Sequence, residues 1–203
     1  MAFTSYAELA TAIADWASRN DTKVTGNVSN FVALAEEKIW QRVRVSWGIT
    51  RAVLTVPAAQ NWVALPEDWL AFKRIRNTNL LMPRMDYAPM DYLEDLPAPG
   101  LPEVYSIEGG RFYWGQTPDV DQTFDIAYYA HPGGLEDMTT TWLLERAPSI
   151  YLYGALVELF MYAKNPAKAA EYGTLFDKAI EELDSSDRAA VISGSQLRMR
   201  RHG

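Results

Sequence analysis

Apolar residues recur at helical spacing near the start of the chain. Ser5 and Glu8 form an S-x-x-E capping box, which predicts the first turn of a helix. The apolar residues that follow its period are Tyr6, Leu9, Ile13 and Trp16. The segment "TKVTGN" (22–27) is expected to be a loop, and a second amphipathic helix is predicted over 28–45.

The segment from 149 to 164 is apolar on all sides. Its single charged residue between Ile150 and Ala163 is Glu158, so other helices must cover nearly every face. An unpaired buried carboxylate is costly, so we expect Glu158 to have a partner or to face a subunit boundary. The nearby candidates for this partner are Tyr162, Lys164 and Arg146.

A sharp corner into a last amphipathic helix is predicted at Asn165 and Pro166. Asparagine caps helices, and proline is tolerated in their first turn. The apolar residues that this helix directs to the core are Ala169, Tyr172, Phe176, Ala179 and Leu183.

The two-residue period of β-strands begins after Gly48. "TRAVLTVPAAQNWVALP" alternates like two strands joined by a turn at 57–61, and "FKRIRN" and "NLLMPR" are further strand candidates. In "PEVYSIEGGRFYWGQTP", Gly109 and Gly110 suit the positive φ values of a tight hairpin turn. "QTFDIAYYAHP" predicts one more strand, and "APMDYLEDL" and "TTTWLLERAP" predict short helices.

Together these elements predict an α+β fold. Residues 1–48 and 135–186 are expected to form one helical bundle, with the apolar helix at its centre. A small antiparallel β region, 49–134, is inserted into this bundle. Residues 187–203 are expected to form an extended C-terminal tail, since Gly194 breaks any helix and few apolar residues follow.

Composition and charge narrow the class of protein. Of the 203 residues, 48% are hydrophobic and 12% aromatic, which excludes a disordered chain. The net charge of −7 argues against a surface built broadly to grip nucleic acid. The chain has no cysteine, so disulfides and thiolate chemistry are excluded. We expect no secretory signal at the start of this sequence. We also expect no membrane span, because the apolar helix is shorter than the about 20 apolar residues that a span needs.

The residues that carry catalysis are scarce. The two histidines, His131 and His202, offer no frame for a Ser-His-Asp triad, and no zinc-ligand cluster is present. "DVDQTFD" (119–125) resembles a calcium loop but lacks the central glycine and the final glutamate. "KRIR" (73–76) raises the possibility of phosphate contacts, but strand alternation is expected to split its charges between two faces. We therefore predict no enzyme activity, cofactor or metal.

Five segments give the chain a family resemblance. They are "YAELATAIADWASRND", "FVALAEEKIWQRVRV", "LTVPAAQNWVALPEDWLAFKRIR", "YSIEGGRFYWGQTPD" and "YYAHPGGLEDMTTTWLLERAPSIYLYGALVELFMYAKN". Their most specific part is the W-L-L-x-x-A-P-x-x-Y-L-Y-G-A-L pattern at 142–156. In these segments the chain resembles the head–tail adaptor (connector) proteins of short-tailed bacteriophages, the tail-tubular-protein-A-like group.

This resemblance implies a structural role in the virion, at the interface of head and tail. Family members form a dodecameric ring beneath the portal protein, extend the channel through which genome DNA is ejected, and dock the tail nozzle or tail tube. The chain is then assembled in host cytoplasm, and DNA passes without specific binding.

The C-terminal tail has two readings. It is either a frayed end or the segment that docks on the portal, as the resemblance implies. The expected portal-interaction residues are Val191, Ile192, Leu197, Arg198, Met199, Arg200 and Arg201. The alternative function is a host-directed helical binding module without catalytic activity.

Overall fold

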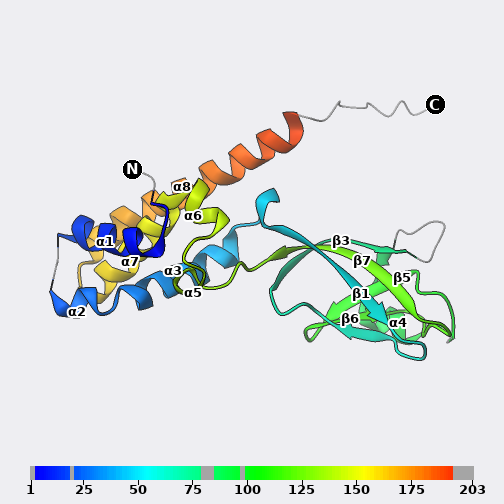
Figure 1. The fold of residues 1–203 in the computed structure, drawn as a ribbon. Coiled ribbons are helices and arrows are strands. Elements are labelled where there is room, and N and C mark those ends of the chain that lie inside the picture. Colours follow the sequence, from blue (N-terminus) through cyan, green and yellow to red (C-terminus); the bar gives the residue numbers. More distant parts are fainter. Residues whose placement is uncertain (1–2, 19–20, 79–84, 97–98, 194–203) are drawn as a thin grey trace. The chain divides into compact units, whose positions relative to one another are not determined.

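The computed structural model of the chain describes residues 3–18, 21–78, 85–96 and 99–193 (Figure 1). The chain divides into two compact units. Residues Ile49–Ala130 form a β unit, and the flanking segments Met1–Gly48 and His131–Gly203 form a helical unit. Within the described residues the fold is α+β, as predicted.

The helical unit consists of long helices joined by short ones. Its α-helices are α1 (Tyr6–Ala17), α2 (Thr22–Thr25), α3 (Val28–Arg42), α5 (Leu135–Met138), α6 (Trp142–Arg146), α7 (Pro148–Tyr162) and α8 (Pro166–Ser193). Residues Ser46–Gly48 add a 3-10 turn. The segment expected as a loop at 22–27 is therefore partly helical, because the Asp21 carboxylate accepts a hydrogen bond from Val24 N at 3.2 Å and caps α2.

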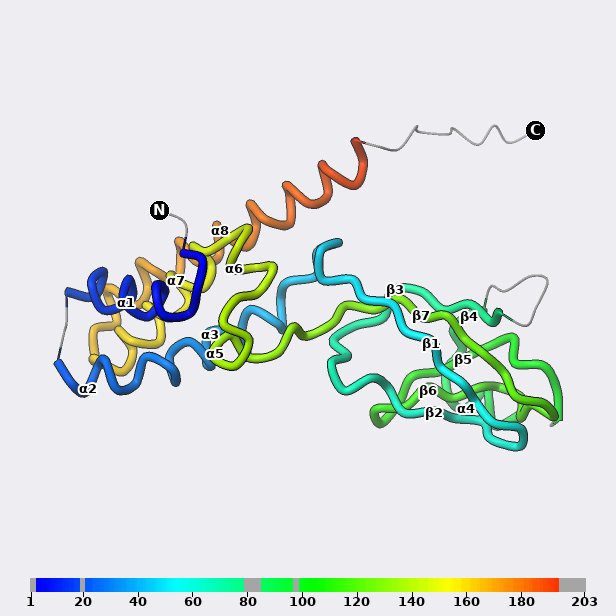
Figure 2. The backbone as a smooth tube through the Cα atoms, in the orientation of Figure 1, coloured from blue at the N-terminus to red at the C-terminus, as the bar shows by residue number. Residues whose placement is uncertain are grey.

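Helix α7, the apolar helix of the sequence, lies in the middle of this unit. It contacts α1, α3, α6 and α8, and these contacts bury most of its length (Figures 1 and 2). Gly154 allows the closest approach, since a Cβ there would lie 3.0 Å from Ala35 Cβ and 3.1 Å from the Phe176 ring. Neighbouring helices thus bury most of the apolar surface of α7 within one chain, while Met161 and Tyr162 at its C-terminal end are exposed.

The predicted cap at Ser5 and the predicted corner at Asn165 are present, and Thr141 adds a cap that was not predicted. The Ser5 hydroxyl accepts a hydrogen bond from Glu8 N at 3.4 Å, and the Thr141 hydroxyl accepts one from Leu144 N at 3.2 Å. At the corner, the Asn165 side chain accepts one from Lys168 N at 3.2 Å, and Lys164 takes a left-handed φ of 55°. These local contacts fix where α1, α6 and α8 begin.

Helix α8 continues further than expected. Residues 187–193, predicted to start the extended tail, form its last turns. Asp187 accepts hydrogen bonds from the backbone and side chain of Ser46, and Arg188 pairs with Asp184 at 2.6 Å. These contacts and the helix-forming Ala189 and Ala190 explain the extension.

The β unit has two sheets. Its strands are β1 (Ile49–Val56), β2 (Trp62–Ala64), β3 (Trp69–Asn77), β4 (Asp86–Tyr87), β5 (Val104–Glu108), β6 (Arg111–Trp114) and β7 (Gln122–Ala130), with one helix, α4 (Met90–Glu94). One sheet has the order β1-β7-β3 and the other the order β2-β6-β5-β4. An aromatic core between them includes Trp114 and Phe124, whose rings stack with centroids 4.0 Å apart.

Strand pairing differs from the predicted antiparallel arrangement in one place, and it connects neighbouring strands of the sequence to different sheets. The two strands predicted on either side of a turn at 57–61 are both present as β1 and β2, but they do not form a hairpin: they belong to different sheets and pair with β7 and β6. β4 pairs in parallel with β5, so the region is not wholly antiparallel. Alternation identifies a strand but does not identify its neighbour. The strand candidate "NLLMPR" (79–84) lies outside the described residues.

The predicted hairpin is confirmed. β5 and β6 pair antiparallel, and Glu108 lies opposite Arg111. Gly109 and Gly110 connect them with φ values of 54° and 76°. Two consecutive positive φ values are those of the turn whose twist matches a two-residue hairpin.

Candidate interaction surfaces

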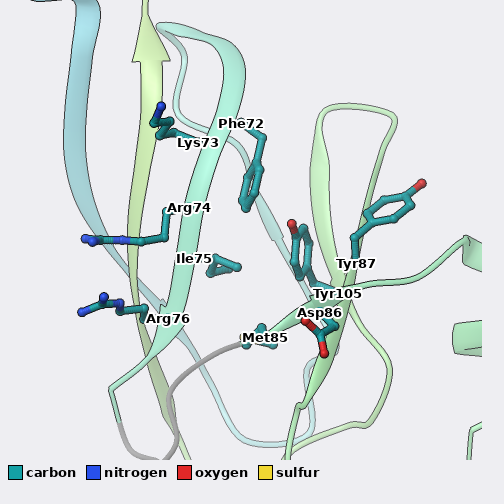
Figure 3. A pocket seen from close by; sticks show the side chains of 9 residues that line it. All are labelled: Phe72, Lys73, Arg74, Ile75, Arg76, Met85, Asp86, Tyr87 and Tyr105. Carbon is teal, nitrogen blue, oxygen red and sulfur yellow. The ribbon is translucent and has the colours of Figure 1, made fainter. Parts of the chain in front are cut away.

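A groove of about 460 Å³ lies between β3 and the β4–β5 edge of the second sheet (Figure 3). Phe72 and Ile75 of β3 point toward Tyr105 and Met85, and the Phe72 and Tyr105 ring centroids are 5.1 Å apart. Burial, with smaller contributions from Asp86 and Tyr87, raises the pKa of Tyr105 to about 12, so its hydroxyl stays neutral near pH 7. The described lining also includes the acidic Asp86, the phenol of Tyr87 and three basic residues of β3, Lys73, Arg74 and Arg76.

On the opposite side of β3, a β-bulge brings three basic side chains together. Phe72 pairs with Tyr128 and Arg74 with Ala127, the next residue of β7, so Lys73 is an extra residue in the strand. Figure 3 shows Arg74 and Arg76 directed away from Phe72 and Ile75. The prediction that strand alternation splits the charges of 73–76 is therefore wrong.

Strand β1 completes this surface. Arg51 and Arg74 are both ladder neighbours of Ala127, on its two sides, while Val53 and Arg76 flank Asp125 in the next row. We call the basic surface formed by Arg51, Lys73, Arg74 and Arg76 the cationic face. These two rows of the sheet contain one acidic residue, Asp125, whose carboxylate accepts a hydrogen bond from Arg74 at 3.2 Å.

Tyr129 lies at one end of the cationic face. The Lys73 amine is 3.4 Å from the Tyr129 hydroxyl oxygen and 5.7 Å from the centroid of its ring. The aromatic ring is therefore already in contact with a basic side chain of the same surface. Sequence reasoning missed this face, although the order apolar-basic-basic-apolar at 72–75 is the signal of an interrupted two-residue period.

In the helical unit, two ion pairs join α3 to its neighbours. Lys38 of α3 pairs with Glu158 of α7, and Arg42 of α3 pairs with Asp177 of α8 at 2.6 Å. The expectation that Glu158 has a partner is confirmed, but the three nearby candidates are wrong. Arg146 instead lies over the Trp47 ring, 3.3 Å from its centroid.

A buried polar cluster connects four helices. Glu36 of α3 accepts a hydrogen bond from Leu135 N at 2.9 Å, and the Tyr151 hydroxyl lies 3.5 Å from the same carboxylate. The Thr141 and Tyr151 hydroxyls are 3.1 Å apart. Burial raises the pKa values of both Glu36 and Tyr151. Each group has a partner within the bundle, which indicates a structural cluster rather than a site of chemistry.

The predicted portal-contacting residues are only partly described. Val191 and Ile192 lie in the last turns of α8, each with 58% of its surface exposed. The remaining residues of that set, Leu197, Arg198, Met199, Arg200 and Arg201, lie outside the described residues.

The described residues show no arrangement typical of catalysis. In this part of the chain, no group of three or more His, Asp or Glu side chains is placed to hold a metal ion. His131 accepts a hydrogen bond from Gly133 N at 2.9 Å, and its ring packs against Trp40. None of the helices described is long and apolar enough to span a membrane.

The comparison with known families decides which contacts are expected. The model of the SU10 adaptor protein family matches residues 4–200, nearly the whole chain. The chain belongs to the SU10 adaptor protein family. This result confirms the resemblance to phage head–tail adaptors, while the tail-tubular-protein-A-like subgroup stays a prediction.

Membership in the SU10 adaptor family gives the chain a structural role as a phage adaptor and virion component. An adaptor of this family interacts with portal and tail components of the phage. No curated protein matches the chain.

Proposed function

We propose that the chain is a head-to-tail adaptor whose copies form a dodecameric ring beneath the portal. The ring extends the DNA channel and docks the tail nozzle or tail tube. The observation that carries this proposal is the match of the SU10 adaptor family to residues 4–200. One feature agrees with it: the W-L-L-x-x-A-P pattern, the most specific part of the resemblance, forms α6 and the start of α7 in the helical unit.

The C-terminal segment is the portal contact in this proposal. Val191 and Ile192 supply exposed apolar surface at the end of α8. Leu197 and Met199 would fill further apolar grooves, and Arg198, Arg200 and Arg201 would pair with portal carboxylates. Because ordering a segment on binding costs conformational entropy, we expect moderate affinity that falls with salt.

Electron microscopy of the purified chain mixed with purified portal protein tests the proposal. We expect a ring of twelve copies bound to one end of the portal. A portal that remains bare at micromolar concentrations of the chain would contradict the adaptor assignment. Capture of a host protein instead would favour the host-directed binding module.

A further inference from the structure

Basic residues of the β unit concentrate on one surface. Residues 49–130 contain eleven acidic and six basic side chains, so this unit is acidic as a whole. Four of the six basic side chains nevertheless form the cationic face. Arg111 lies on the other sheet, 4.0 Å from the centroid of the Trp62 ring, and Arg84 is outside the described residues. The charge of the unit is thus strongly separated in space.

The spacing of the cationic face suits a row of phosphates. Arg74 and Arg76 are two residues apart along β3, which places their Cα atoms about 7 Å apart. Arg51 lies two strands away from Arg74, at about 10 Å, with the small Ala127 between them. No described carboxylate lies within ion-pair distance of Arg51 or Arg76. Their guanidinium groups are therefore available to an external anion.

We propose that the cationic face binds the phosphate backbone of duplex DNA without reading its sequence. Guanidinium groups bind phosphate through paired hydrogen bonds, and three of the four basic residues are arginines. A sheet face presents its side chains on a broad surface and inserts no helix into a groove, so base readout is not expected.

Duplex DNA fits this surface better than the other polyanions. Single strands need aromatic platforms for base stacking, and the aromatic ring of this face, Tyr129, already contacts Lys73. The centre of a protein–protein interface is usually apolar, whereas the central row of the cationic face consists of Arg51, Ala127 and Arg74. This surface therefore suits an acidic protein less well than DNA. Because the whole chain carries −7, its long-range field repels DNA, so binding should be weak and steeply salt-dependent.

Fluorescence anisotropy with a labelled DNA duplex of about 20 base pairs tests this proposal on the full chain. Three or four phosphate contacts predict a slope of about −3 to −4 in the logarithm of affinity against the logarithm of salt concentration. The triple variant R51Q/R74Q/R76Q should bind at least about tenfold more weakly at low salt, with a slope nearer zero. Circular dichroism and the melting midpoint check that this variant folds.

Two control variants identify the source of binding. K178Q/R188Q removes basic side chains from α8 and should bind DNA like the unmodified chain, because neither residue belongs to the cationic face. R198Q/R200Q/R201Q removes the three arginines that follow α8 in the sequence. If this tail variant loses DNA binding while the R51Q/R74Q/R76Q chain retains it, the proposal is overturned.

Two other outcomes would also overturn it. One is the absence of any duplex binding by the unmodified chain at low salt. The other is stronger binding to poly-glutamate than to DNA through the same three arginines, which would identify an acidic protein as the occupant. The assay uses the free chain, so its result does not depend on ring formation.

Discussion

The ion pair between Lys38 and Glu158 illustrates how one side chain can depend on a residue far along the sequence. The Glu158 side chain is only 13% exposed, whereas that of Lys38 is 53% exposed. Removing Lys38 would leave a largely buried carboxylate without its ion-pair partner, which costs more than the loss of an exposed pair.

We expect Lys38→Ala to lower the free energy of unfolding by about 1 kcal/mol, measured by urea denaturation. Lys178→Ala is the matched control. Lys178 pairs with Glu182 at 3.8 Å, and both side chains are well exposed, so its loss should cost less than about 0.5 kcal/mol. Equal effects of the two substitutions would show that Glu158 does not need Lys38.

Glu36 gives the stability a pH dependence of known sign. Burial raises the pKa of Glu36, so the folded protein holds this proton at higher pH than the unfolded chain does. The charged carboxylate therefore lowers stability above the folded pKa, and this penalty disappears as the pH falls toward the unfolded value of about 4.3.

Glu36→Gln should remove this dependence, because the amide is uncharged and its oxygen can still accept the hydrogen bond from Leu135 N. We expect the melting midpoint of the variant, minus that of the unmodified chain, to be larger at pH 7 than at pH 5. Other carboxylates are common to both chains and cancel in the difference. A difference that grows as the pH falls would contradict the sign.

Among the helices, Gly154 sets how closely α3, α7 and α8 pack. A Cβ at this position would crowd both Ala35 and the Phe176 ring, at 3.0 and 3.1 Å. We expect Gly154→Ala to cost about 1–3 kcal/mol of unfolding free energy, the usual range for overpacking. Chemical denaturation of the variant and of the unmodified chain measures this change in unfolding free energy.

Gly173→Ala on α8 is the control for this substitution. A Cβ at Gly173 would meet no atom within 4 Å, and alanine is the better helix former. It should raise the unfolding free energy by up to about 1 kcal/mol. If both alanines stabilise the chain, the close approach at Gly154 is not a constraint.

Local signals predicted helix ends and turns, because the residues that decide them are neighbours in sequence. Ser5, Asn165 and the Gly109–Gly110 pair are examples. Strand partners and the pairing of Glu158 with Lys38 could not be predicted, since both depend on residues brought together only by the tertiary fold. The cationic face could not be predicted for the same reason, because a β-bulge forms only where two strands pair.

For the molecule as a whole, the C-terminal segment should matter for assembly and not for folding. A truncation after Ser193 removes only residues outside the described part of α8 and keeps Asp187, which accepts hydrogen bonds from Ser46. We expect an unchanged melting midpoint and lost or much weakened ring formation on the portal. If the truncated chain assembles on the portal as well as the full chain does, the segment has no role in assembly and is only a frayed end.

A cut after Ser186 is a different experiment, because it also removes Asp187 and the last turns of α8. We expect this shorter chain to melt at a lower temperature than the chain that ends at Ser193. The comparison separates the contribution of the helix to stability from that of the segment beyond it.

The central strand of one sheet and the central helix of the helical unit both come late in the sequence, and this order affects folding during synthesis on the ribosome. β7 is the middle strand of the β1-β7-β3 sheet, yet it follows both of its neighbours in the chain. Helix α7, which α1, α3 and α8 surround, is likewise made long after α1 and α3. A nascent chain that has not reached Tyr162 therefore lacks at least part of the central element of the helical unit. Helices α1 and α3 therefore emerge with the faces that contact α7 uncovered, and these faces remain uncovered until α7 has been made.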